Sequence, residues 1–208
     1  MYKSPFRKKA TLTCAFKTKG KWRAGFHTGE DWVCDDDTIL SPCNARVSYI
    51  GYDGSGYGNY IILHTNDGKS ILMAHFSYIL VEEGDKLSQG EHIGKMGSTG
   101  NSTGKHLHIE VENYKEWNYG KNLIKPSDYI DFNNFNTSSV NVYKNGSTIE
   151  YVYSTVSECK HQNINDSIGY LDPYETCELL RTVDGVYLVL YNTNKNGKKC
   201  GFVKFKGV

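Results

Sequence analysis

Hydrophobic and polar residues alternate along much of the chain, which is the pattern that β-strands produce. Two strand-like segments, 59–65 and 69–75, flank Asn66-Asp67-Gly68, a sequence that strongly favours a tight hairpin turn. Counting outward from this turn places His64 beside it and His75 at the far end of the hairpin. We therefore expect His64 to be an ordinary strand residue and His75 to be available for a functional site.

A further alternating segment, 106–112, has apolar residues at its odd positions, so a strand there would place them on the core face. The opposite face then carries His106, His108, Glu110 and Glu112. Two histidines separated by one residue on a strand aim their imidazoles into the same space. We expect both glutamates to be solvated on the open side of the sheet; the alternative is that one of them orients an imidazole.

The earlier segment 25–31 contains His27 and Asp31 in an H-x-x-x-D arrangement, and its glycines favour a loop or an extended strand over a helix. A polar, glycine-rich segment at 97–104 leads into the strand that carries the paired histidines. It lacks the Gly-Lys-Ser/Thr ending of a phosphate-binding loop and precedes a strand rather than a helix. We therefore do not expect it to bind phosphate.

The C-terminal part of the chain has short strands rich in tyrosine and valine, separated by Asn-Gly and Asp-Gly turns. These turns are at 145–146, 184–185 and 196–197. About five or six strands in so short a segment predict a small β-barrel. A polar stretch at 133–139 predicts a linker. We therefore expect a mostly β protein, with an antiparallel β-sheet domain at 1–132 followed by a barrel at 140–208.

The charge balance excludes some classes of partner. The chain has 24 lysines and arginines against 23 acidic residues, so no net charge favours nucleic acid or an anionic membrane. No apolar run approaches the ~20 residues needed to span a bilayer, and we expect no membrane insertion. The basic segment 1–9 is not followed by an apolar stretch, so the sequence predicts no secretory signal.

Six cysteines divide three and three between the two halves of the chain, and no pair shows C-x-x-C spacing. An odd number in each half argues against a disulfide framework, so we expect most of them to be reduced, buried, small apolar residues. Cys34, shortly after Asp31, is a candidate metal ligand. It is disfavoured because two imidazoles and a carboxylate already complete a three-ligand set.

The residue types suit metal chemistry. Two imidazoles and a carboxylate are the ligands of a catalytic zinc ion that keeps its fourth position open to water. An H-x-x-x-D segment or an H-x-H strand alone is weak evidence, but together, and with His75 nearby, they predict a metal site. A structural zinc site usually closes with four protein ligands. A phosphatase or nuclease is expected to use more carboxylates and a second metal ion.

Three segments, 25–31, 73–77 and 97–110, resemble peptidase family M23, the lysostaphin/LytM-type zinc endopeptidases that cut peptidoglycan peptides. The glycine-containing run 84–94 matches as well, and the resemblance covers roughly residues 20 to 112. It implies that one zinc ion is bound by three residues and that two further histidines form a catalytic pair. The implied ligands are His27, Asp31 and His108, and the implied catalytic residues are His75 and His106.

The resemblance does not say which of His75 and His106 acts as the general base. Some M23-like relatives lose ligands and serve as silent wall-binding, regulatory or virion structural proteins. All five residues of the implied site are present here. We therefore expect a zinc-dependent endopeptidase that hydrolyses cross-bridge or stem-peptide bonds of bacterial peptidoglycan.

The C-terminal part resembles a different module. Segments 168–175 and 201–204 are similar to bacterial SH3-type domains, which often anchor wall hydrolases to peptidoglycan. A zinc endopeptidase joined to a wall-binding domain, without a signal peptide, resembles a phage endolysin. We expect a monomer that is stored in the host cytoplasm before its release to the cell wall, where peptidoglycan is its partner. A prophage remnant or a bacteriocin-type hydrolase is an open alternative.

Overall fold

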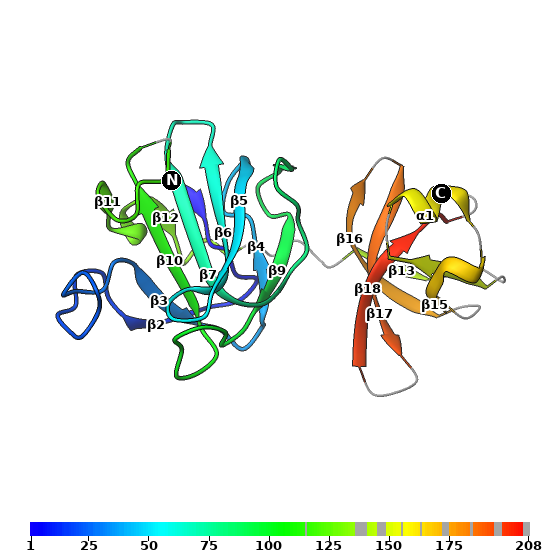
Figure 1. The fold of residues 1–208 in the computed structure, drawn as a ribbon, viewed down its shortest axis with the longest axis horizontal. Coiled ribbons are helices and arrows are strands. Elements are labelled where there is room, and N and C mark those ends of the chain that lie inside the picture. The colour runs from blue at the N-terminus through cyan, green and yellow to red at the C-terminus, as the bar shows by residue number, and fades with distance from the viewer. Residues whose placement is uncertain are drawn as a thin grey trace. The chain divides into compact units, whose positions relative to one another are not determined.

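The computed structural model describes most of the chain, which divides into two compact units, Met1–Ser138 and Ser139–Val208 (Figure 1). The described residues are 1–114, 116–135, 141–144, 149–154, 156–162, 164–171, 175–183, 185–193 and 197–205. Parts of the expected linker at 133–139 and of the expected turns at 145–146, 184–185 and 196–197 lie outside these residues. Each unit has its own sheet and its own apolar core.

The first unit is built on a ten-stranded sheet whose main path runs β2-β3-β10-β7-β6-β5-β8. Its strands are β2 (Thr11–Cys14), β3 (Glu30–Val33), β10 (Leu107–Glu112), β7 (Ser70–Ile79), β6 (Gly58–Thr65), β5 (Ala45–Asp53) and β8 (Lys86–Leu87), extended by β4 (Thr38–Leu40), β9 (His92–Met96) and β11 (Leu123–Ile124). All pairings within this sheet are antiparallel. A separate parallel pair joins β1 (Tyr2–Lys3) to β12 (Ile130–Asp131). The expected antiparallel β-sheet fold of this unit is confirmed.

Strands β6 and β7 form the expected hairpin, and Gly68 adopts the positive φ of 82° that the tight turn requires. His64 pairs with Ser70 beside this turn, as the count predicted. Farther along, the pairing shifts between Asn59 and Ile61, so β7 carries one residue more than β6. His75 lies in this β-bulge with a φ of 66°. Bulges often re-aim a side chain next to a functional site.

The core of the first unit packs against the face of β10 that the alternation assigned to the interior. Leu107, Ile109 and Val111 are fully buried there. Burial of each such side chain stabilises the fold by roughly 1.5–3 kcal/mol. The same cluster includes Phe6, Ile39, Val47, Ile61, Leu63, Ile71, Met73, Phe76, Ile93 and Met96. A smaller cluster covers the opposite face of the sheet, formed by Tyr60, Ile62, Leu72 and Ala74.

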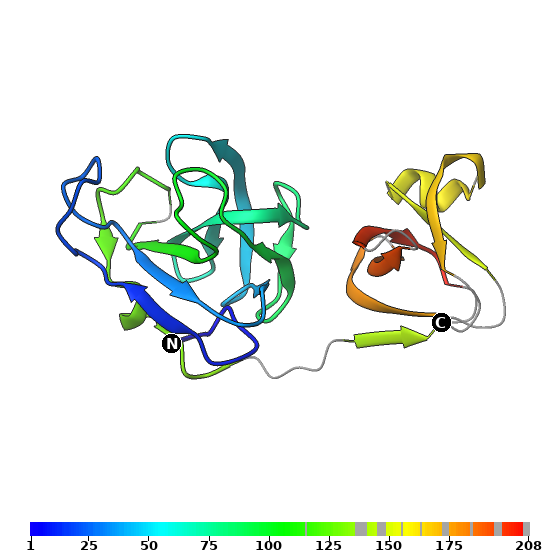
Figure 2. The same cartoon turned by 90° about the horizontal axis from the view of Figure 1, so that it is seen from below.

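The second unit contains one six-stranded antiparallel sheet in the order β13-β16-β17-β18-β14-β15. Figures 1 and 2 show the strands of this unit in two views. Its strands are β13 (Asn141–Lys144), β14 (Glu150–Tyr153), β15 (Ser167–Leu171), β16 (Thr176–Val183), β17 (Val186–Thr193) and β18 (Gly197–Val203). Val152, Leu171, Val189 and Val203 form the centre of its core. Among the described residues, no pairing joins the edge strands β13 and β15 into a closed barrel.

Helical structure is minor. The second unit contains a short helix, α1 (Val156–His161), and a 3-10 turn, η2 (Ile164–Asp166); the first unit contains the 3-10 turn η1 (Pro126–Asp128). Over the residues that the structure describes, no helix is long and apolar enough to cross a membrane.

Candidate metal centre

Three ligand-type side chains converge where β3 meets β10. Asp31 in β3 pairs directly with His108 in β10, which places both side chains on the same face of the sheet. Asp31 Oδ1 lies 2.8 Å from His108 Nδ1 and 3.0 Å from His27 Nε2, and the two nitrogens are 3.1 Å apart. A tetrahedron around zinc with bonds of about 2.0–2.1 Å has edges of about 3.3 Å. The three atoms therefore fit one metal ion.

Local sequence explains how His27 reaches this position. The segment before β3 runs so close to β10 that a Cβ on Gly29 would lie 2.2 Å from the Ile109 carbonyl oxygen. Only glycine fits between the two ligands. The backbone N–H of His27 donates to the Thr18 carbonyl (2.8 Å), and Nδ1 lies 3.2 Å from the Ala15 carbonyl. When Nδ1 carries the proton and donates it to the Ala15 carbonyl, the unshared electron pair of Nε2 is free to bind the metal.

The second nitrogen of His108 is held by a buried carboxylate. His108 Nε2 lies 2.8 Å from Oε1 of Glu110, which also accepts hydrogen bonds from the hydroxyl groups of Thr28 and Tyr57. Glu110 and Glu112 are both 0 % exposed, so the expectation that they are solvated is wrong. Period-two alternation assigns a face to each residue, but it does not show that Tyr57 and the segment after β10 cover this face.

The electrostatics follow from this packing. Burial opposes ionisation of Asp31, but hydrogen bonds from His108 and His27 outweigh it and lower the pKa of the carboxyl. For His108, burial alone would lower the pKa of the imidazole, but hydrogen bonds and charge interactions with Asp31 and Glu110 raise this pKa to about 9. In the metal-free protein an imidazolium thus lies between two carboxylates. A metal bound at Nδ1 takes the place of a proton there.

Two further imidazoles lie beside the three ligands. The rings of His75 and His106 have centroids 4.6 Å apart, and that of His75 is 5.9 Å from His108. His75 Nδ1 donates to the Thr99 carbonyl (2.8 Å), and His106 Nδ1 lies 2.8 Å from the Gly104 carbonyl. His106 Nε2 is 3.7 Å from Asp31 Oδ1. In both rings Nε2 is therefore the nitrogen left for a substrate.

Burial is the main cause that lowers the pKa of His75 to about 4, and the neighbouring His106 and His108 lower it further, although the hydrogen bond to Thr99 opposes them. At neutral pH His75 is an uncharged imidazole with its proton on Nδ1. Such a ring has an unshared electron pair on Nε2 and can accept a proton there.

The glycine-rich loop 97–104 positions His75. Gly100 has a φ of 71°, and a Cβ on it would lie 2.2 Å from the backbone nitrogen of Gly58. This close approach seats Thr99, whose hydroxyl donates to the Phe76 carbonyl (2.9 Å) and whose carbonyl oxygen meets His75. The glycines thus allow two loops to touch beside the metal centre.

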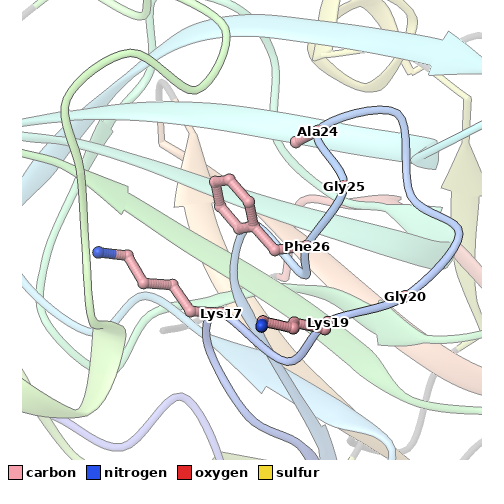
Figure 3. Close-up of a pocket in the computed structure, with 6 residues that line it drawn as sticks. All are labelled: Lys17, Lys19, Gly20, Ala24, Gly25 and Phe26. Carbon is pink, nitrogen blue, oxygen red and sulfur yellow. The ribbon is translucent and has the colours of Figure 1, made fainter.

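A shallow hollow of about 610 Å³ lies in the loop between β2 and β3, immediately before His27 (Figure 3). It is lined by Lys17, Lys19, Gly20, Ala24, Gly25 and Phe26. The ring of Trp22, in the same loop, lies 5.1 Å from that of His27. An aromatic ring and two ammonium groups suit a ligand that is part apolar and part anionic. The sequence marked segment 25–31, but nothing in its spacing marked residues 17–24 of this loop or Tyr57.

The other histidines and Cys34 lie outside this cluster. His92 begins β9 and is buried, with Nε2 3.0 Å from the Gly94 carbonyl. His161 is exposed. Cys34 Sγ faces the carbonyls of Lys8 and Lys9 at 3.8 and 3.7 Å rather than the ligands.

All six cysteines are free thiols, but only Cys43, Cys159 and Cys177 are buried. Half of the cysteines are therefore buried, whereas most were expected to be. Cys14, which the sequence did not mark, is half-buried and lies with His27 and Asp31 in one group of potential ligands.

Replacing Glu110 with glutamine is expected to weaken metal binding by about 10- to 100-fold, because the carboxylate fixes the ring of His108 and raises its basicity. Competition with a chromogenic chelator at fixed pH measures this. Glu112→Gln is the matched control: Glu112 is equally buried on the same strand, but it accepts hydrogen bonds from the backbone N–H groups of Asn118 and Gly120. Equal affinities in the two variants would contradict a positioning role for Glu110.

The fold and the site together define an antiparallel β-sheet domain with a candidate metal centre. Residues 25–121 match the model of peptidase family M23. Over 91 residues the chain is 39 % identical to DD-carboxypeptidase/endopeptidase Mpg of Neisseria meningitidis serogroup B, covering 43 % of this chain and 20 % of that protein. Over 92 residues it is 40 % identical to lipoprotein NlpD of Yersinia enterocolitica, covering 44 % of this chain and 88 % of the relative. The chain belongs to peptidase family M23.

A solved structure agrees with this family. The catalytic domain of the antimicrobial peptidase lysostaphin from Staphylococcus simulans is 25 % identical, with a TM-score of 0.52, over 58 % of this chain and 90 % of that domain. The chain spans about a fifth of the length of several curated relatives that it matches. The first unit thus contains a domain of peptidase family M23.

Proposed function

We propose that the protein is a zinc-dependent endopeptidase that hydrolyses peptide bonds of bacterial peptidoglycan. The observation that carries this proposal is the cluster of His27, Asp31 and His108, whose three ligand atoms lie 2.8–3.1 Å apart. Asp31 lies in β3 and His108 in the paired strand β10, and two further imidazoles lie beside these ligands. The Neisseria relative, named an endopeptidase, supports the same reaction class.

The geometry supports a proposed role for each of the five residues. Zinc held by His27, Asp31 and His108 would supply Lewis-acid activation of water and of the scissile carbonyl. His75 and His106 keep Nε2 directed away from the carbonyls that hold their Nδ1 atoms. One of these imidazoles accepts the proton of the attacking water and returns it to the leaving amine nitrogen. The other, when it carries a proton on Nε2 as well as on Nδ1, donates a hydrogen bond to the oxygen on which negative charge develops.

The test is digestion of purified cell walls from several bacteria by the zinc-loaded full chain. We expect new free amino groups, and mass spectrometry of the released fragments would identify the bond that is cut. A chelator should stop the release and added zinc should restore it. Intact peptides, or new reducing sugar ends without new amino groups, would reject an endopeptidase.

The proposal for the second unit is that it is an SH3-like module that binds the cell wall, so that the whole chain acts as a phage endolysin. Its support is a separate unit with its own core and exposed apolar side chains at Ile168 and Tyr170. Tethering to the wall raises the substrate concentration that the peptidase meets. A monomer released from the host cytoplasm fits this role. Sedimentation of the full chain with purified walls tests the binding.

The second candidate is a catalytically silent M23-like domain that binds the wall, regulates a hydrolase or serves as a virion structural protein. The observation that favours it is the Yersinia relative, which is 40 % identical but is named a lipoprotein, not a peptidase. The same digestion separates the two candidates. Wall binding by a metal-loaded chain that releases no amino groups would support this second function.

A further inference from the structure

The edge strand β2 places Cys14 beside the metal centre. The pairing of β2 with β3 starts at Thr11 and Leu12, opposite Val33 and Trp32, and then shifts, so that Cys14 pairs with Asp31. Without this bulge, Thr13 would pair with Asp31. Residues directly opposite each other on paired strands have side chains on the same face. The bulge therefore turns the Cys14 side chain to the face that carries the ligand Asp31.

The distances agree with this register. Cys14 Sγ, an imidazole nitrogen of His27 and a carboxylate oxygen of Asp31 all lie within 4.8 Å of one another. Zinc–sulfur bonds of about 2.3 Å and zinc–nitrogen bonds of about 2.0 Å place the two ligand atoms about 3.5 Å apart in a tetrahedral site. A rotation of the half-buried Cys14 side chain that moves Sγ by up to about 1.3 Å would bring it to this distance from the His27 nitrogen.

We propose that Cys14 is a fourth ligand of the metal held by His27, Asp31 and His108. Its thiolate takes the position that the three-ligand set leaves open to water, and so keeps the peptidase latent until substrate displaces the sulfur. The inference rests on the proposed function and adds its regulation. On ligation the thiol proton passes to solvent and the sulfur–metal bond forms; displacement reverses both, with no change of oxidation state. Four protein ligands close a zinc site, whereas three leave it catalytic.

The test is the absorption spectrum of the full chain loaded with cobalt(II) in place of zinc. A thiolate ligand gives a sulfur-to-cobalt charge-transfer band in the near ultraviolet. We expect this band in the unmodified protein and in Cys34→Ser, and its loss in Cys14→Ser. Cys34 is the matched control because it is also a half-buried free thiol near β3, with its sulfur directed at backbone carbonyls.

Two further measurements complete the test. The affinity for zinc should fall about tenfold or more in Cys14→Ser, whereas turnover of wall peptides should rise because the open position is no longer blocked. A cobalt-loaded chain without the band would overturn the role of Cys14 and leave the three-ligand site intact. A chain that binds no cobalt would overturn both proposals. Since the unmodified protein gives the first reading, the outcome does not depend on the variant folding.

Discussion

Replacement of His108 by alanine abolishes both metal binding and wall hydrolysis, if the centre is as proposed. Nδ1 of His108 lies within 3.1 Å of the other two ligand atoms, so the substitution removes one of the three atoms that define the site. We expect metal content to fall from one ion per chain to background, and the affinity to drop by more than about 100-fold, beyond the usual effect of a residue that only supports a ligand. Metal analysis after gel filtration and release of amino groups from walls measure both losses.

The alanine variant also leaves the buried carboxylate of Glu110 without its imidazole partner, which costs stability. Asp31→Asn is therefore a second variant, because it preserves size at a partly exposed position and still weakens the ligand set. His161→Ala is the control, since this exposed histidine lies in the other unit. Retained hydrolysis in His108→Ala, with circular dichroism showing a folded chain, would end the proposal.

The sequence predicts the parts of this site that depend on local pattern. Alternation gives the faces of β10, and the Asn-Asp-Gly turn gives the β6–β7 hairpin and the distinction between His64 and His75. The resemblance to family M23 carries the five-residue set, which the structure brings into one cluster. These features need only residue type and spacing.

The remaining features depend on the pairing of distant strands. One extra residue in β7 gives His75 its positive φ, and one extra residue in β2 turns Cys14 toward Asp31. Alternation assumes regular strands, so it misses both shifts. Burial of Glu110 likewise depends on Tyr57, which lies 53 residues away in sequence. Such partners become apparent only when the sheet order is known.

Alanine at His75 or at His106 is expected to keep the metal and to lower turnover by about 10²- to 10⁴-fold, the usual contribution of a positioned acid or base. Neither ring makes one of the three contacts of 2.8–3.1 Å that define the metal cluster. Metal content should therefore stay at one ion per chain while kcat falls and KM changes little. Steady-state rates on a defined wall peptide, with metal analysis of the same samples, provide the measurement.

His75 has a further variant that separates chemistry from backbone strain. Asparagine tolerates the left-handed backbone region better than most residues, so His75→Asn should keep the bulge and still lack the imidazole. We expect its turnover to match that of His75→Ala. Recovery of turnover in His75→Asn would mean that the bulge, not the ring, supports catalysis. Loss of metal from either the His75 or the His106 variant would mean that a ligand and a catalytic residue have been interchanged, because removing a proton-transfer group leaves the coordinating atoms in place.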